Sequence, residues 1–195
     1  MTSHEDDELT PEQRERRALM RRAEDLARGG DRAGASAIYA GIHERFPTMP
    51  EPVIRLGILR RADNDQLGAI DFFTRALALD PGSRVLCLRA GSLLALGRLD
   101  EAMADVEASL MTDPGEQSSL LLRARVLVML ARDDEARRIV DDLLARQEQP
   151  DALNLRADLH ERSGDAVAAA RDRARAREVV AGPRGIFAGF WKPRK

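Results

Sequence analysis

The chain has 195 residues, 44% of them hydrophobic and only 4% aromatic, with a formal net charge of −2. This near-neutral charge offers no basic surface of the kind that binds duplex nucleic acid. The single cysteine, Cys87, excludes an internal disulfide, and no apolar stretch reaches the roughly 18 residues that a membrane span needs. We therefore expect helices that pack through Ala and Leu, with charged outer faces.

Residues 1–10 are acidic, and we expect them to be disordered. They lack the basic-then-apolar order of a secretory signal, which favours the cytoplasm, although export by a route without such a signal stays open. Thr10-Pro11-Glu12-Gln13 has the pattern of a helix start, with Thr as the cap, Pro at the first position and Gln three residues after the cap. The first helix is therefore predicted to begin near Pro11.

A sequence pattern then returns about every 34 residues, and such a period is typical of a repeat architecture. We place its five copies at residues 16–49, 50–82, 83–116, 117–149 and 150–181. Each copy has one small residue early and a second one twelve positions later, where two closely packed helices would cross. The early residues are Ala23, Gly57, Ala90, Ala124 and Ala157, and the later ones are Ala35, Ala69, Ala102, Ala136 and Ala169.

Each copy is predicted to form two helices. In the third copy the first helix covers residues 84–96, and Gly97 can end it in the left-handed conformation. The second helix covers residues 101–111 and stops at Asp113-Pro114-Gly115. Large residues are expected to fill the space between copies: Tyr39, Phe73, Val106 and Val140. The fifth copy has Arg173 at this position, which suits a terminal repeat whose outer face meets solvent.

This pattern resembles the tetratricopeptide repeat family. The stretch from Gly97 to Ala102, followed by Asp113-Pro114, is very close to the family consensus. The second copy fits equally well through Gly57, Ala69, Phe73, Ala76 and Asp80-Pro81. The resemblance covers roughly residues 16–181. It implies an all-α fold, an α-solenoid of about five helix-turn-helix repeats in a right-handed superhelix, whose first helices line a concave groove for a protein or peptide.

No residue pattern indicates catalysis, a cofactor or a metal. The sequence contains no His-Glu-x-x-His pair, no phosphate-binding Gly-rich loop and no Gly-x-Ser-x-Gly elbow. Cys87 has no candidate base, so a structural role is expected. The first helices also lack the Lys/Asn/Arg clamp with which some tetratricopeptide co-chaperones hold a chaperone's C-terminal carboxylate. We therefore predict a protein that is not an enzyme.

The first helices of copies three and four are apolar nearly all round, which means burial nearly all round. We expect Cys87, Leu94, Leu121 and Val128 to form an exposed apolar patch in the groove, with Met129 beside it; a thick core is the alternative. Arginines that flank the patch would select acidic neighbours. The predicted groove residues are Arg17, Ile58, Arg84, Cys87, Leu94, Leu121, Arg125 and Val128.

Residues 182–195 form an aromatic and basic tail that contains the only Trp. We expect Phe187, Phe190 and Trp191 to dock on the end of the fifth copy, in the groove of the same or a neighbouring chain, or on another protein. Docking on a membrane surface is a further alternative for this short segment.

The sequence predicts a bacterial, cytoplasmic adaptor or scaffold. The bacterial origin is an inference from the Arg- and Ala-rich composition, in which Lys192 and Lys195 are the only lysines. The partner would be an apolar or helical polypeptide segment with acidic flanks. Two alternatives remain: a secretion-type chaperone that shields an apolar export substrate, and a self-assembling structural protein whose tail enters a neighbour's groove.

Overall fold

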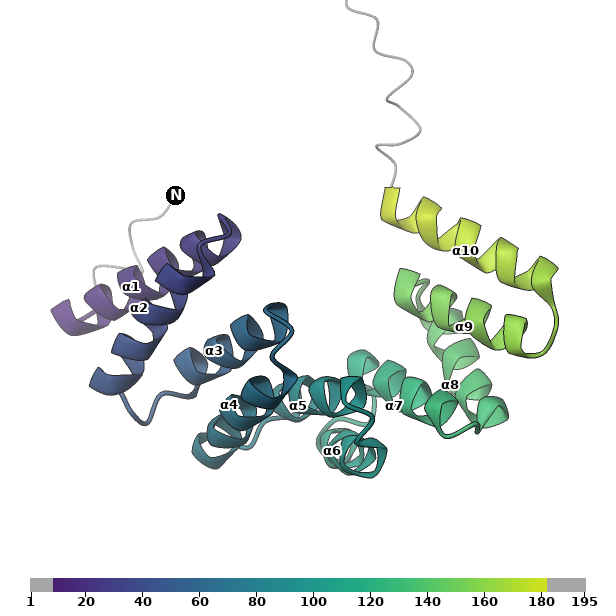
Figure 1. The fold of residues 1–195 in the computed structure, drawn as a ribbon, viewed down its shortest axis with the longest axis horizontal. Coiled ribbons are helices and arrows are strands. Elements are labelled where there is room, and N and C mark those ends of the chain that lie inside the picture. The colour runs from purple at the N-terminus through teal and green to yellow at the C-terminus, as the bar shows by residue number, and fades with distance from the viewer. Residues whose placement is uncertain (1–8, 182–195) are drawn as a thin grey trace, which may run out of the picture. The chain divides into compact units, whose positions relative to one another are not determined.

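The computed structural model describes residues 9–181, which form ten α-helices and no strand (Figure 1). The helices are α1 (Pro11–Arg28), α2 (Arg32–Arg45), α3 (Pro50–Ala62), α4 (Gln66–Leu79), α5 (Ser83–Ala95), α6 (Leu99–Thr112), α7 (Gln117–Met129), α8 (Asp133–Arg146), α9 (Pro150–Arg162) and α10 (Ala166–Ala181). They form five consecutive pairs with the predicted period, so the all-α fold of five repeats is confirmed. The handedness of the superhelix stays a prediction.

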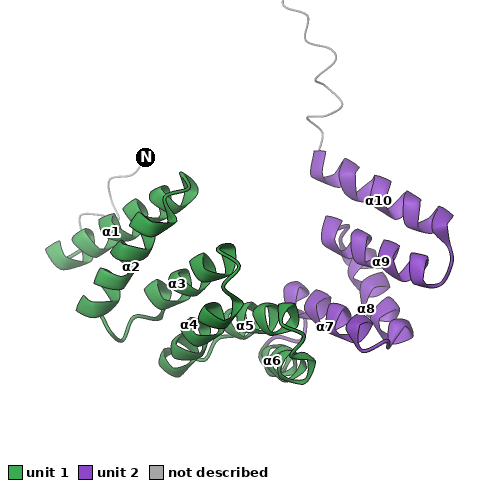
Figure 2. Ribbon diagram, viewed as in Figure 1, with its two compact units in different colours: residues 1–112 green, residues 113–195 purple. Residues whose placement is uncertain are grey.

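The helices belong to two compact units, with the boundary between Thr112 and Asp113 (Figure 2). The first unit contains α1–α6 and the second contains α7–α10. Within each unit every helix packs against the next one in the chain. First helices also contact each other directly, α3 with α5 in the first unit and α7 with α9 in the second. A surface made of first helices therefore exists within each unit.

The first helix begins where the sequence predicts it. The backbone N–H of Gln13 donates to Thr10 Oγ1 at 3.2 Å, and the N–H of Thr10 donates to Gln13 Oε1 at 2.8 Å. This reciprocal pair satisfies two backbone donors that an α-helix leaves open at its start. In the third repeat α6 starts at Leu99 rather than Glu101, because one left-handed residue, Gly97, suffices to turn the chain.

The turn inside each repeat contains one residue with a positive φ angle. These residues are Gly30 (91°), Asn64 (63°), Gly97 (71°), Ala131 (57°) and Gly164 (83°). Gly adopts this conformation without steric cost and Asn tolerates it, whereas the Cβ atom of Ala clashes with the backbone there. The fourth repeat therefore carries local strain at Ala131 that the other four avoid.

The ten small residues predicted at the helix crossings are all buried. The large residues beside them are buried as well, since Tyr39, Phe73, Val106 and Val140 are at most 2% exposed. In the fifth repeat Arg173 takes this position and pairs with Asp158, at 3.0 Å, and with Glu161, both on α9. The end of the array thus has ion pairs where the other repeats have an apolar contact.

Candidate protein-binding surface

Four charged side chains form a continuous chain of ion pairs across the first helices α1, α3 and α5. Arg55 NH2 lies 3.0 Å from Glu24 Oε1, and Arg55 Nε lies 2.8 Å from Glu51 Oε1. Arg84 NH1 lies 3.4 Å from Glu51 Oε2. The four side chains are between 27% and 59% exposed. They therefore belong to one solvent-facing surface that is shared by three consecutive repeats.

A depression of about 350 Å³ lies beside this ion-pair chain. It is lined by Glu24, Ala27, Arg28, Tyr39, Arg55, Ile58 and Leu59, which come from α1, α2 and α3. The lining combines apolar groups with three charged side chains, a mixture common in ligand sites, and the volume is at the small end for such sites. The depression can hold one or two apolar side chains of a bound segment.

Tyr39 forms a neutral part of this lining. Its side chain is 2% exposed. Burial raises the pKa of its phenol above the usual value, while the nearby Arg55 acts in the opposite direction. The phenol is therefore protonated at neutral pH, and the charge of the depression comes from Glu24, Arg28 and Arg55.

Two arginines near the depression are held only loosely. Arg28 NH1 lies 2.8 Å from Asp25 Oδ1, with 75% of the Arg28 side chain exposed. Arg84 forms a longer pair with Glu51 and is 59% exposed. Exposed pairs of this kind contribute only about 0–1 kcal/mol to stability. Replacing Asp25 or Glu51 by the carboxylate of a ligand therefore costs little.

The predicted groove residues of the first unit lie on first helices. Ile58 lines the depression and Arg84 belongs to the ion-pair chain. Arg17 on α1 and the two α5 residues Cys87 and Leu94 are half-buried. Their part in binding stays a prediction. We use the name first-helix surface for Glu24, Arg28, Glu51, Arg55, Ile58 and Arg84.

The expectation that Leu121 is exposed is wrong. Leu121 on α7 is only 8% exposed, because α7 packs against both α8 and α9. Val128 is half-buried, whereas Met129 is 60% exposed. Arg125 NH2 lies 3.7 Å from Asp151 Oδ2 of α9. The apolar stretch of α7 thus contributes mainly to the core of the second unit, as the thick-core alternative supposed.

Sequence reasoning missed Arg28, Glu51 and Arg55 of the first-helix surface, and Tyr39 in the lining of the depression. A signal for one contact was present: Glu51 and Arg84 carry opposite charges at the same position of consecutive repeats. Residues at equal positions on adjacent first helices can meet, so opposite charges one period apart indicate an ion pair. The repeat pattern predicts for Tyr39 only a role in filling the space between repeats.

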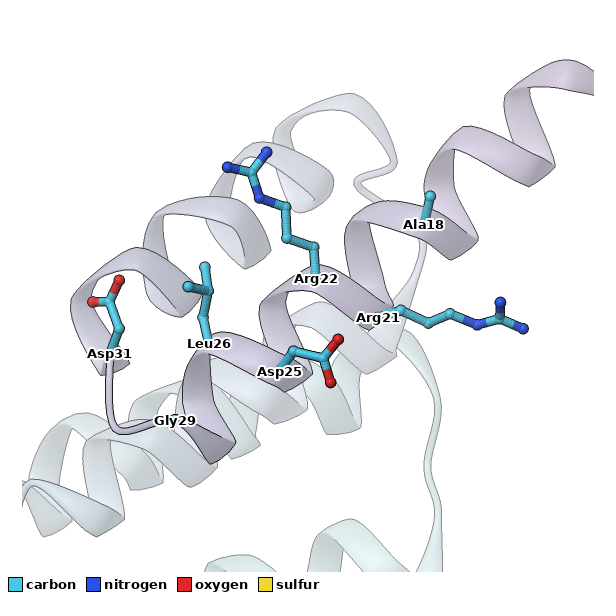
Figure 3. A pocket seen from close by; sticks show the side chains of 7 residues that line it. All are labelled: Ala18, Arg21, Arg22, Asp25, Leu26, Gly29 and Asp31. Carbon is cyan, nitrogen blue, oxygen red and sulfur yellow. The ribbon is translucent and has the colours of Figure 1, made fainter.

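A second, more open hollow of about 590 Å³ lies along α1. Its lining residues are Ala18, Arg21, Arg22, Asp25, Leu26, Gly29 and Asp31. The charged side chains point in different directions and share no common centre (Figure 3). A ligand site needs a few convergent polar groups, so we assign no site to this hollow.

The structure does not describe all of the predicted features. Phe187, Phe190 and Trp191 fall outside the described residues, as do residues 1–8. Among residues 9–181, no group of three His, Cys, Asp or Glu side chains is arranged to hold a metal ion. In the same part of the chain, no helix has both the length and the apolar character that crossing a membrane requires.

Comparison with known families identifies this arrangement. Residues 93–159 match the family model described as Tetratricopeptide repeat. The chain contains tetratricopeptide repeats. Over 141 residues, or 72% of its length, this tetratricopeptide repeat (TPR) chain is 33% identical to cellulose synthase operon protein C of Xanthomonas axonopodis pv. citri (strain 306). It spans only 9% of the length of that relative.

Solved structures show the same fold. A thermophilic TPR protein of Thermus thermophilus is 18% identical, with a TM-score of 0.74, over 88% of this chain and 94% of that one. The first TPR of Spaghetti (RPAP3), bound to the HSP90 peptide SRMEEVD, is 19% identical with a TM-score of 0.56. That match covers 60% of this chain and 93% of the other. At these identities the likeness concerns the fold alone.

Proposed function

We propose that this TPR protein is a non-enzymatic scaffold that binds a polypeptide segment on the first-helix surface. The observation that best supports this proposal is the depression of about 350 Å³, whose lining combines apolar and charged groups. It lies beside an exposed chain of ion pairs. An apolar side chain of the segment would enter the depression beside Ile58. Acidic residues on either side of it would pair with Arg28 and Arg84, whose present ion pairs are weak.

The peptide-bound neighbour supports the class of ligand. The peptide SRMEEVD in that structure contains one Met and three acidic residues. An apolar residue among acidic ones is also what the depression and its arginines suit. We do not extend the chaperone-tail clamp to this chain, because its first helices lack the Lys/Asn/Arg set.

Site-specific photo-crosslinking tests the location of the partner. A photoreactive residue in place of Ile58 is expected to capture a polypeptide in cells of the host. The matched control carries the same group in place of Leu67, which is 66% exposed on the second helix α4. Equal capture from both positions, or capture from position 67 alone, would contradict binding on the first-helix surface.

The captured partner then allows a binding measurement. Ile58→Asp is expected to weaken binding by at least about tenfold, since it places a charge in an apolar contact, while Leu67→Asp changes it little. Arg84→Glu is expected to weaken binding and to reduce its salt dependence. If Arg84→Glu leaves binding unchanged, acidic flanks are not part of recognition.

We further propose that the bound segment continues past Cys87 and Leu94 on α5 and that Arg17 contributes at α1. On α7 of the second unit, Arg125 and Val128 are proposed to contact the partner as well. The competing hypothesis is self-association, in which residues 182–195 of one chain would bind these surfaces of a neighbouring chain. Light scattering on the full chain and on a version ending at Ala181 distinguishes them, because only self-association predicts oligomers that the shorter version loses.

A bacterial host and a cytoplasmic location remain proposals. The relative from Xanthomonas and the similar structure from Thermus support a bacterial host. Fractionation of host cells, with immunodetection of the untagged protein, tests the location. Recovery outside the cytoplasmic fraction would contradict it.

A further inference from the structure

An arginine occurs at the same position of repeats one, three, four and five, as Arg22, Arg89, Arg123 and Arg156. Two of these arginines bind a buried aspartate through a bidentate contact. Arg89 Nε and NH2 lie 2.8 and 2.7 Å from the carboxylate oxygens of Asp105. Arg156 makes the same contact with Asp172 at 2.7 and 2.9 Å. Parallel hydrogen bonds of this kind are among the strongest that a carboxylate accepts.

Arg123 lacks this partner. The residue one repeat after Asp105 and one repeat before Asp172 is Ile139, which offers no acceptor. Arg123 Nε is buried and has no hydrogen-bond partner among residues 9–181, although the residue as a whole is only half-buried. A buried donor on a charged group that makes no hydrogen bond is costly to the folded state. A carboxylate that reaches the guanidinium of this half-buried residue would supply an acceptor.

Glu135 is an acidic neighbour of Arg123 within the second unit. Arg132 binds both carboxylate oxygens of Glu135, at 2.7 and 2.8 Å. That hydrogen bond is the main cause that lowers the pKa of Glu135, and Arg138 and Arg123 add to it through their charges. Glu135 is thus already engaged by Arg132, and it does not replace the missing aspartate.

We propose that Arg123 is a binding site for a carboxylate from an acidic polypeptide segment, which supplies the partner that Asp105 and Asp172 provide in the neighbouring repeats. A carboxylate is the group that the same arginine binds twice in this chain. The site lies on a different unit from the first-helix surface and does not depend on the function proposed for that surface.

The Nε–Hε signals of arginines in a ¹⁵N-labelled full-length chain test this site. The probe is a short glutamate-only peptide with blocked ends, and inorganic phosphate and a serine-only peptide are the comparisons. The Arg123 signal is identified by its loss in Arg123→Gln. We expect the glutamate peptide to move the Arg123 signal while those of Arg89 and Arg156, already bound to aspartate, stay in place.

Ile139→Asp is the matched variant, because it recreates the contact of the neighbouring repeats. It is expected to move the Arg123 signal towards those of Arg89 and Arg156 without any peptide, and to weaken peptide binding at least about tenfold. If this variant does not fold, the peptide titration of the unaltered chain still tests the proposal. An unmoved Arg123 signal, unchanged peptide affinity in Ile139→Asp, or much tighter binding of phosphate than of the peptide would overturn the proposal.

Discussion

A Cβ atom added to Gly57 would lie 2.6 Å from Cε1 of Phe73. The phenyl ring of α4 therefore occupies the space of a methyl group at the crossing with α3. The other four repeats have Ala at the position of Gly57. Repeats three and four combine that Ala with a smaller partner, Val106 or Val140. In the second repeat the ring of Phe73 therefore leaves no room for an Ala at position 57, whereas the first repeat accommodates Ala23 together with Tyr39.

Replacing Gly57 by Ala is expected to destabilise the protein. Overpacking a buried contact costs about 1–3 kcal/mol, and Phe73 is fully buried. The better helix propensity of Ala offsets up to about 1 kcal/mol of that cost. Urea unfolding followed by circular dichroism measures the net loss of stability.

The double variant Gly57→Ala/Phe73→Val provides the control, since it reproduces the Ala90 and Val106 combination of the third repeat. Its loss of stability should be smaller than the sum of the two single losses, because the smaller side chain removes the overlap. Strictly additive losses would show that the two positions do not limit each other.

Replacing Ala131 by Gly is expected to stabilise the fourth repeat. Ala131 has a φ angle of 57°, and this conformation costs a residue with a Cβ atom about 1–2 kcal/mol. Gly avoids the clash, although it loses more backbone entropy on folding. The net gain is therefore about 1 kcal/mol, which a rise of the urea midpoint would report.

The reverse substitution, Gly97→Ala, tests the same cause at the matching turn of the third repeat. Gly97 has a φ angle of 71° and open space around its missing Cβ atom, so any loss comes from the backbone conformation. Ala174→Gly, at an exposed position in the middle of α10, should instead cost about 1 kcal/mol. A loss of similar size in Ala131→Gly would contradict strain at the turn.

The sequence carried most of the information about the fold. The repeat period placed the small residues at the crossings, and all ten are buried. Local chemistry located the helix start at Thr10 and the left-handed turn at Gly97. These features depend on contacts within one repeat or between neighbouring repeats, and such contacts recur with the period.

The candidate binding surface was predicted only in part. The period indicates which helix carries a residue, but the exposure of that residue depends on the particular side chains of adjacent helices. The repeat pattern predicts both Ile58 and Leu121 in the groove, but Ile58 is half-buried and Leu121 is buried. The ion pairs of Arg55 with Glu24 and Glu51 depend on side-chain directions that a period does not specify.

Replacing Leu121 by Ala is now expected to weaken the fold of the second unit. Truncating a buried Leu removes apolar contacts and leaves a cavity, at a cost of about 2–5 kcal/mol. Met129→Ala is the control on the same helix, because Met129 is 60% exposed and its truncation should cost less than about 0.5 kcal/mol. Urea unfolding of both variants measures the two losses of stability. Equal losses would indicate that Leu121 is as exposed as Met129.

Replacing Glu116 by Gln should destabilise the protein in a pH-dependent way. Glu116 caps α7, and its carboxylate accepts hydrogen bonds from the backbone N–H groups of Ser118, at 3.1 Å, and Ser119. Burial alone raises the pKa of Glu116, but the hydrogen bonds from Ser119 and Ser118 together lower it below its usual value. The folded state therefore favours the charged form more than the unfolded state does.

The sign of the effect follows from this lowered pKa. The carboxylate contributes its full stability above the pKa of the unfolded chain, roughly 4.3, and the contribution is lost as the pH falls through the lower pKa of the folded state. At pH 7 we expect Glu116→Gln to cost about 0.5–1 kcal/mol, as for other partly solvated helix caps. The difference from the unaltered protein should shrink below about pH 4, where protonated Glu resembles Gln.

Urea midpoints measured from pH 7 down to pH 3 test this, with Glu107→Gln at an exposed position of α6 as the control. A constant difference across that range would assign the effect to side-chain shape rather than to charge.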